Sequence, residues 1–378
     1  MTVQLLLNNI TCVSFYLLAL VSFFNPAKLN ITANKWFGLC MFSAGCMLLN
    51  AIIYEAGAEA QYADVILFNE LSRFIIAPAL YLSIVHFTSP YKEFKNREYL
   101  HFIPSALFLI FMAATAAGYQ LFTLLHIPGR IPAIIISLFV KVQLLVYWVL
   151  AWYTLMRHKR DIQLINSTTE GVDLSWLQYM LLGIAVMLAA WFASILLQQA
   201  HWIQLIISAG YLTGVLSTGY FLLAQKEVYP FDQPELQNIA EVISQPAKQG
   251  KQRLSQAQSI ELQSRLTDLM ATQKTYLDNE LSLPVLAKEL NVSTHDLSYL
   301  LNEVLGTSFF KFINNYRVEE AKQLMLSAQH QHLNLLGIAY AAGFNSKTTF
   351  NTAFKNETGL SPSQFINQNK RVISTASA

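Results

Sequence analysis

Polar side chains near the C-terminus recur at a spacing that suits contact with a nucleic acid. Lys347, Asn351 and Lys355 are four residues apart, and Thr348 lies beside the first of them. Lysine donates hydrogen bonds to guanine or to phosphate, and an asparagine amide suits adenine. Residues four apart share one face of a helix. The spacing therefore predicts a DNA-contacting helix face, the alternative being that some of these residues are ordinary solvated side chains.

The same region contains a weak internal repeat, in which two stretches match residue by residue. The matched pairs are Leu286 and Ile338, Ala287 and Ala339, and Asn291 and Gly343 at an offset of 52, then Ser293 and Ser346, Leu297 and Phe350, Leu301 and Phe354, Gly306 and Gly359, and Phe312 and Phe365 at an offset of 53. The change of offset places one additional residue in the second turn.

Each half of the repeat has the pattern of a helix-turn-helix. A small residue, Ala287 or Ala339, allows a second helix to cross closely. Asn291 or Gly343 suits a turn position with positive φ. A serine then caps the second helix, and Ser293 with Asp296 resembles a capping box. The sequence thus predicts two helix-turn-helix motifs in tandem.

These residues resemble the AraC/XylS-type DNA-binding domain over about residues 273–373. The most specific stretches are AAGFNSKTTFNTAFK at 341–355 and TGLSPS at 358–363, and Tyr316-Arg317 with Ala321 is similar to the helix that joins the two halves. The resemblance implies two recognition helices that enter successive major-groove segments of double-stranded DNA. It also implies a regulator with RNA polymerase and a second copy of the chain as expected partners.

Charge divides unequally between the two halves. Residues 276–330 have a net charge of −3 and residues 331–378 a net charge of +3. Because phosphate neutralisation supplies most non-specific DNA affinity, we expect the second half to be the electrostatic anchor. Arg317 is expected to reach a phosphate or to pair with a neighbouring glutamate. The full set of expected DNA contacts is His295, Ser298, Tyr299 and Asn302 in the first half, and Ser346, Lys347, Thr348, Asn351 and Lys355 in the second.

The preceding part of the chain is far more apolar. The whole chain is 54% hydrophobic and 13% charged, and 20 of the first 225 residues are charged against 28 of the 153 that follow. A bilayer core needs roughly 20 apolar residues as a helix. Seven stretches qualify and predict a polytopic domain: approximately 5–24, 36–54, 66–88, 100–118, 131–154, 176–197 and 202–224.

Basic residues in the loops predict the orientation of these spans. Loops after the first, third and fifth spans carry eight Lys and Arg residues, whereas those on the other side carry only Arg130. Basic loops stay in the cytoplasm. The N-terminus is then outside a bacterial inner membrane, and seven spans place the C-terminal domain in the cytoplasm.

Three ionisable residues lie inside predicted spans, where charges are costly and usually mark function or pairing. Glu70 and Arg73 are three apart and form either a structural pair or a ligand or proton site. Lys141 has no acidic residue within a helical turn, so its partner is expected from another helix, with Glu70 the candidate, or from a bound anion.

Residues 226–272 read as a cytoplasmic linker that ends in a helix. Pro230, Pro234 and Pro246 interrupt its first part. Leu262 and Leu266 begin a stripe at steps of four and three that continues to Tyr276. This helix is expected to dock on the domain behind it, the alternative being a short dimerising coiled coil.

The sequence therefore predicts an all-α chain: a seven-helix membrane domain over 1–225, the linker over 226–272 and the tandem helix-turn-helix domain over 273–373. No catalytic, cofactor-binding or metal-binding motif is present in the sequence, so no enzyme is expected. The expected function is a one-component regulator that senses an unidentified small-molecule or membrane signal. The alternative is a receptor or transporter whose C-terminal module binds a protein partner.

Overall fold

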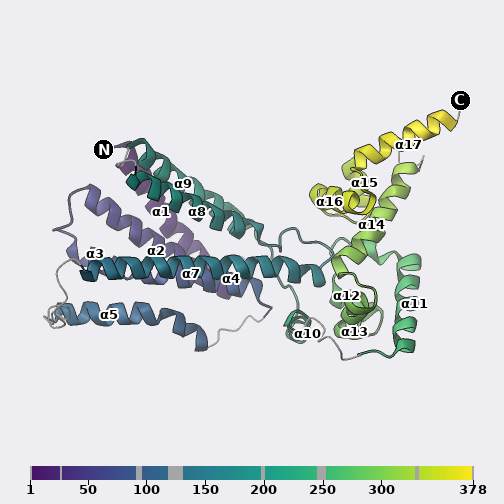
Figure 1. Ribbon diagram of the computed structural model, residues 1–378, viewed down its shortest axis with the longest axis horizontal. Coiled ribbons are helices and arrows are strands. Elements are labelled where there is room, and N and C mark those ends of the chain that lie inside the picture. The colour runs from purple at the N-terminus through teal and green to yellow at the C-terminus, as the bar shows by residue number, and fades with distance from the viewer. Residues whose placement is uncertain are drawn as a thin grey trace. The chain divides into compact units, whose positions relative to one another are not determined.

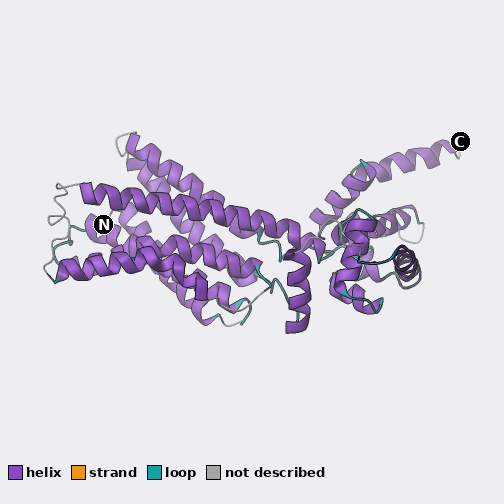
Figure 2. Ribbon diagram, turned by 60° about the horizontal axis from the view of Figure 1, so that its bottom comes forward, coloured by secondary structure: helices purple, strands orange, loops and turns teal. Residues whose placement is uncertain are grey.

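The computed structural model describes residues 2–25, 28–90, 96–117, 131–196, 201–244, 253–327 and 332–376. These residues form helices joined by turns, and no strand occurs among them (Figures 1 and 2). The predicted all-α fold is confirmed. The chain divides into a first unit, Met1–Arg157 with Leu174–Val228, and a second unit, His158–Asp173 with Tyr229–Ala378. Composition predicts the boundary near Gln225 but gives no sign that 158–173 belongs with the C-terminal residues.

The first unit contains long apolar helices at the positions of the predicted spans. They are α1 (Val3–Phe24), α2 (Ile31–Glu55), α3 (Ala63–Glu70) with α4 (Ser72–Thr88), η1 (Asn96–Phe102) with α5 (Ile103–Ala116), α7 (Ile131–Asp161, whose last residues belong to the second unit), α8 (Ser175–Leu196) and α9 (His201–Ala224). Six segments of the described chain are long and apolar enough to cross a membrane. The apolar part of α8, Ser175–Ala190, is shorter than these six segments.

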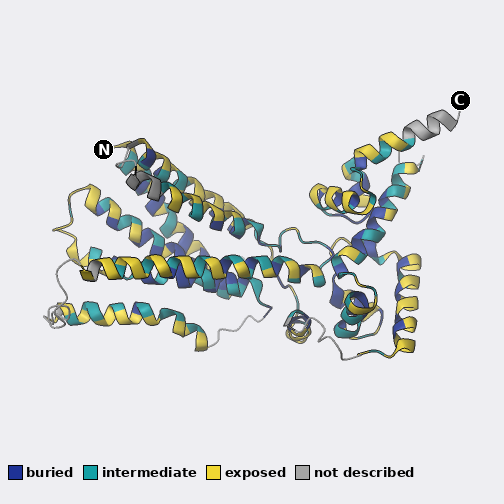
Figure 3. Ribbon diagram, in the orientation of Figure 1, coloured by how far each residue is buried: buried dark blue, intermediate teal, exposed yellow. Residues whose placement is uncertain are grey.

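Apolar side chains cover the outer faces of these helices as well as their contacts. Leu138, Leu145 and Val149 on α7 are all more than half exposed, and Figure 3 shows exposed residues along most of that helix. A helix that is hydrophobic all round belongs in the core of a large protein or in a membrane.

Glycines let α1 and α2 pack closely. A Cβ added at Gly45 would lie 2.9 Å from Cε1 of Tyr16, and one added at Gly38 would lie 3.0 Å from Cδ2 of Phe23. The Cys12 thiol also donates to the Gly45 carbonyl at 3.5 Å. Small residues at a helix crossing are the usual means of close packing in membranes. All three cysteines of the chain are buried.

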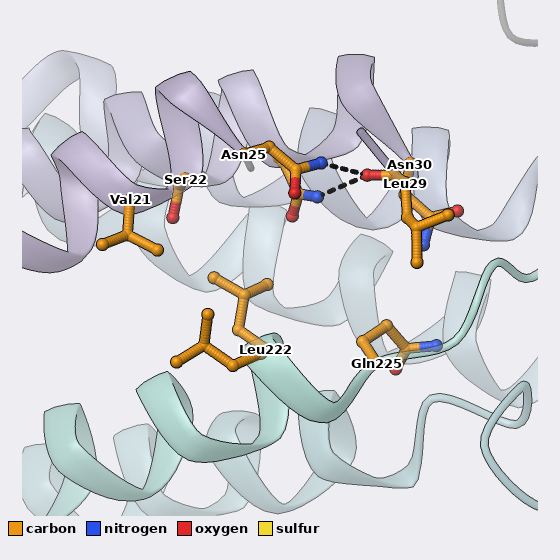
Figure 4. A pocket seen from close by; sticks show the side chains of 9 residues that line it. Val21, Ser22, Asn25, Leu29, Asn30, Leu222 and Gln225 are labelled. Atoms are coloured by element: carbon orange, nitrogen blue, oxygen red, sulfur yellow. Dashed lines mark hydrogen bonds between the residues drawn. The ribbon is translucent and has the colours of Figure 1, made fainter. Parts of the chain in front are cut away.

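Amides tie the chain leaving α9 to the turn between α1 and α2, beside the small pocket in Figure 4. Asn25 and Asn34 both donate to the Leu29 carbonyl. Asn30 donates to the Lys226 carbonyl at 3.1 Å and accepts from the Val228 amide at 3.4 Å. The point at which the chain leaves the first unit is therefore fixed by hydrogen bonds.

The ionisable residues of the predicted spans occupy two places. Glu70 and Arg73 form an ion pair of 2.7 Å, and Asn50 donates to Glu70 at 3.3 Å. Lys141 is exposed on α7. Glu70 and Arg73 thus form a pair, and the partner expected for Lys141 stays a prediction.

The second unit is an array of shorter helices. They are η2 (Ile162–Leu164), α10 (Gln233–Ser244), α11 (Gln256–Gln273), η3 (Thr275–Leu277), α12 (Leu283–Glu289), α13 (Thr294–Tyr299), the π-turn η4 (Leu300–Val304), α14 (Phe309–Leu326), α15 (Leu335–Ala341), α16 (Lys347–Thr358) and α17 (Pro362–Ala376). The linker that composition predicts therefore contains a helix of its own, α10, before the expected α11.

Two small hydrophobic cores share α14. Phe309 and Ile313 belong to the first core, with α11, α12 and α13, whereas Val318 and Ala321 belong to the second, with α15 and α16. Leu262 and Leu266 on α11 are buried in the first core. The prediction that α11 docks on the domain behind it is confirmed.

Gly343 is where the second helix-turn-helix meets the first half. Its φ is +87°, and a Cβ there would lie 2.6 Å from the Tyr276 carbonyl oxygen and 2.8 Å from Cα of Leu277. Because these neighbouring atoms belong to the backbone, they cannot move aside as the end of a flexible side chain can. Gly359 also has positive φ (+74°), but a Cβ there meets nothing within 4 Å.

These two glycines give a matched test of the packing. Gly343→Ala should lower the free energy of unfolding of the second unit by more than about 3 kcal/mol, because left-handed strain and overpacking add. Gly359→Ala should cost only about 1–2 kcal/mol, from strain alone. Pulse proteolysis of the full chain in lipid nanodiscs across a urea series measures both. Equal losses in the two variants would contradict the close approach at Gly343.

Candidate nucleic-acid interface

Both halves of the repeat fold as helix-turn-helix motifs with the predicted turn and cap residues. In the first, Asn291 has a φ of +52°, and Ser293 Oγ accepts from the Asp296 amide at 3.1 Å. In the second, Gly343 takes the left-handed position and Ser346 Oγ accepts from the Thr349 amide at 3.1 Å. Each cap satisfies one otherwise unpaired amide at the start of the second helix, so the predicted caps are confirmed.

Helix α16 is the second helix of the second motif, and we call it the second reading helix. One of its faces packs on the core and another is exposed. Phe350 and Phe354 are buried in the second core, as predicted. Lys347, Asn351 and Lys355 are exposed and lie four apart along the flank of the helix next to these phenylalanines. Thr348 is exposed beside them, whereas Ser346 is buried and acts as the cap. The open face therefore offers two ammonium groups and an amide from successive turns.

The first reading helix, α13 with η4, is less open. Its four predicted contact residues, His295, Ser298, Tyr299 and Asn302, are all half-buried. The Asn302 amide donates to the Ser298 carbonyl at 3.0 Å and to Ser298 Oγ at 3.1 Å. These two side chains are thus brought together and partly satisfied by each other.

Helix α10 packs against α13 and accounts for part of this burial. Glu241 on α10 places Oε2 3.1 Å from Nε2 of His295, and Val242 is buried in the first core. Arg253, just before α11, lies 3.6 Å from Asp296 on α13. The carboxylate of Glu241 therefore contacts the imidazole of His295, which the sequence predicts to contact a base.

Local ion pairs leave the electrostatic contrast between the halves in place. Lys274 pairs with Glu320 at 2.8 Å, and Lys322 pairs with Glu319 at 2.7 Å. In the part of the chain that the structure describes, neither Lys347 nor Lys355 makes an ion pair. The cationic groups of α16 are accordingly available to phosphates, while those around α14 are largely used internally.

Arg317 has neither of the roles that the sequence predicts. Its side chain is fully buried. Nε donates to the Tyr276 carbonyl and Nη2 to the Asp278 carbonyl, both at 2.7 Å. Burial lowers the pKa of the guanidinium to about 10, partly offset by the charge of Asp278. Both the phosphate contact and the glutamate pair are therefore wrong, because the carbonyls at the end of η3 lie within reach and solvent does not.

Ser167, which sequence reasoning missed, completes the shell around Arg317. Its Oγ accepts from Nη2 at 2.9 Å and donates to the Leu281 carbonyl at 2.7 Å. Its carbonyl accepts from Nη1 of Arg317 at 3.2 Å and from the Asn314 amide at 3.1 Å. Leu283, the first residue of α12, donates its amide to the Ile165 carbonyl at 2.7 Å. The short segment between α7 and α8 is thus part of the helix-turn-helix unit.

Known proteins match the C-terminal part of the chain. Residues 286–368 match the family model of a helix-turn-helix domain. The HTH-type transcriptional activator RhaS of Escherichia coli O139:H28 (strain E24377A / ETEC) is 27% identical over 99 residues, which are 26% of this chain and 34% of RhaS. RhaS of Escherichia coli (strain SE11) matches to the same extent. The chain thus covers 34% of the length of these curated relatives. No solved structure matches the chain.

The open face of α16 generates a prediction about salt dependence. Lys347→Ala and Lys355→Ala should each weaken DNA binding and flatten the slope of log affinity against log salt by about one unit. A variant with one phosphate contact fewer releases fewer counterions when it binds. Lys311→Ala removes an exposed charge from α14 and should leave the slope unchanged. Fluorescence anisotropy at several salt concentrations measures this. Parental slopes in both α16 variants would refute the assignment.

The contact between α10 and α13 generates a second prediction. Ile239→Asp charges the buried face of α10 and should release the helix, raising DNA affinity by about tenfold or more. Glu241→Gln should have a smaller effect, since a half-exposed pair contributes about 0–1 kcal/mol. Glu235→Gln makes the same charge change elsewhere on α10 and should have none. Unchanged or weaker binding by Ile239→Asp would show that α10 does not limit access to α13.

Proposed function

From the AraC-type helix-turn-helix domain that the chain carries at its C-terminus, we propose that the protein is a membrane-anchored, sequence-specific DNA-binding transcription regulator. It senses its signal through the membrane domain and acts without a separate kinase or second component. The open face of α16 carries this proposal, because Lys347, Asn351 and Lys355 present donors suited to phosphate and base edges on one helix.

The two reading helices have different roles in this proposal. Helix α16 anchors the protein through Lys347, Lys355 and the dipole at its start, and reads bases through Thr348 and Asn351. Helix α13 adds polar contacts from Ser298, Tyr299 and Asn302 once α10 has moved away. A single chain with one accessible reading helix should bind weakly, so a second copy of the chain and RNA polymerase are proposed partners at the promoter.

The first unit is the proposed membrane anchor. Its apolar segments and their exposed apolar faces support insertion in a bilayer. The excess of basic residues in alternate loops supports an N-terminus outside and a C-terminal domain in the cytoplasm of a bacterial inner membrane. Lys92 and Lys95 of those loops, and Arg130 on the other side, lie outside the described residues, so the argument for orientation rests on the sequence.

Regulation follows from two segments that join the units covalently. Residues 158–173 connect α7 to α8 and belong to the second unit, and α10 follows α9 and packs on α13. A movement of α7, α8 or α9 would therefore act directly on the helix-turn-helix unit. A signal shifts such an equilibrium only by binding one arrangement better than the other.

The test uses the full chain in lipid nanodiscs and a library of fragments from the host genome. The chain should enrich a small set of duplexes that share a motif, and a Lys347→Ala, Lys355→Ala double variant should enrich none. Both versions are also incubated with a lysate of the host. If both recover the same protein from it and neither enriches a duplex, the alternative of a receptor or transporter that binds a protein partner is favoured.

Topology has an independent readout. A reporter fused after Gln225 should be active if it requires the cytoplasm and silent if it requires export. Activity of the exported reporter at that position would contradict both the number of spans and the cytoplasmic DNA-binding domain.

A further inference from the structure

An open cavity of about 730 Å³ lies among α1, α2, α4, α7, α8 and α9 of the first unit. Pockets that hold a drug-sized ligand are roughly 300–1,000 Å³ and mostly apolar. Phe15, Leu80 and Leu144 contribute hydrocarbon walls from α1, α4 and α7. The size of the cavity therefore suits a single elongated or polycyclic molecule.

Several aromatic residues that line the cavity have their polar atoms engaged elsewhere. Trp148 Nε1 donates to the Leu181 carbonyl at 3.0 Å, and Trp176 Nε1 donates to Gln225 Oε1 at 2.6 Å. The Tyr147 hydroxyl lies 2.8 Å from Nδ1 of His101. These rings offer mainly apolar surface to an occupant, so the body of the ligand must be hydrocarbon.

Arg73 is the one charged residue among those that line the cavity. One of its terminal nitrogens holds Glu70 at 2.7 Å, yet 45% of the side chain is exposed. A guanidinium has five donors in a planar fork that suits a carboxylate or phosphate. The donors that Glu70 does not use can bind one further acceptor, and a carboxylate or phosphate matches their geometry best.

Two glycines border the cavity without serving helix packing. A Cβ added at Gly183 on α8 or at Gly214 on α9 meets nothing within 4 Å. At Gly210, also on α9, a Cβ would lie 2.8 Å from Sδ of Met187. Glycine in membrane helices usually permits close approach, as Gly210 does. Gly183 and Gly214 instead leave space open beside the cavity.

We propose that this cavity is the binding site of an acidic amphiphile, with its hydrocarbon chain between α7, α8 and α9 and its acidic head at Arg73. Binding itself is independent of DNA recognition; only its role as the regulatory signal rests on the proposed function. The ligand contacts α7 and α8, the two helices that residues 158–173 connect.

Quenching of Trp148 and Trp176 by a brominated fatty acid provides a local probe once the other four tryptophans are replaced by Phe. The full chain in nanodiscs should show saturable quenching that palmitate displaces, hexadecanol displaces less well and hexadecylamine displaces least. Arg73→Gln should abolish the preference for palmitate over hexadecanol. Gly214→Leu and Gly183→Leu fill the open space and should each raise the dissociation constant by about tenfold or more.

Ala209→Leu is the matched control, because it adds bulk to α9 at an exposed position that does not line the cavity. It should bind as the parent does. All of these variants should keep the melting temperature and the elution volume of the parent, which reports that the first unit is folded, and they should also retain DNA binding. Parental affinity in both glycine variants would overturn the site. Equal displacement by palmitate and hexadecanol, or occupancy by bilayer phospholipid that palmitate does not displace, would overturn the acidic amphiphile. Either failure with intact DNA binding would leave the proposed function standing.

Discussion

The buried guanidinium of Arg317 is the interaction on which the helix-turn-helix unit depends. It lies on α14, the helix that both hydrophobic cores share, and it donates to the carbonyls of Tyr276 and Asp278. A buried charge is strongly destabilising unless its donors are satisfied. Tyr276 belongs to η3 and Asp278 caps its end, and η3 in turn lies against the turn at Gly343. One cation therefore joins α14, which both cores share, to η3, which contacts the turn of the second motif.

The same guanidinium incorporates a segment from the apolar part of the chain. Ser167 supplies a hydroxyl and a carbonyl to Arg317, and the bridge between Asn166 and Ser282 aligns this segment with the start of α12. Without residues 165–167 the guanidinium would lose two acceptors, a loss of roughly 1–3 kcal/mol for each buried donor left unpaired. The helix-turn-helix unit is thus built from two separate stretches of sequence.

Local features of the DNA-binding domain could be predicted from the sequence, and long-range ones could not. Asn291, Gly343, Ser293 and Ser346 have the turn and cap geometry expected of them, because each role is decided by the residue's own backbone preference and its neighbours within one turn. The contacts of Ser167 and Glu241 join residues far apart in sequence, through polar side chains that carry no periodic signal. The roles predicted for Arg317 are wrong for the same reason, since most of its acceptors are backbone carbonyls, which every residue has.

Hydrogen exchange of the full chain in nanodiscs tests most directly whether the segment between α7 and α8 is part of the DNA-reading unit. The Ser167 amide donates to the Leu281 carbonyl at 3.2 Å, and the Leu283 amide donates to the Ile165 carbonyl at 2.7 Å. Both amides should exchange as slowly as those in the middle of α14, because they open only when the unit unfolds. Exchange of both at the rate of an unstructured loop, while α14 remains protected, would contradict the account.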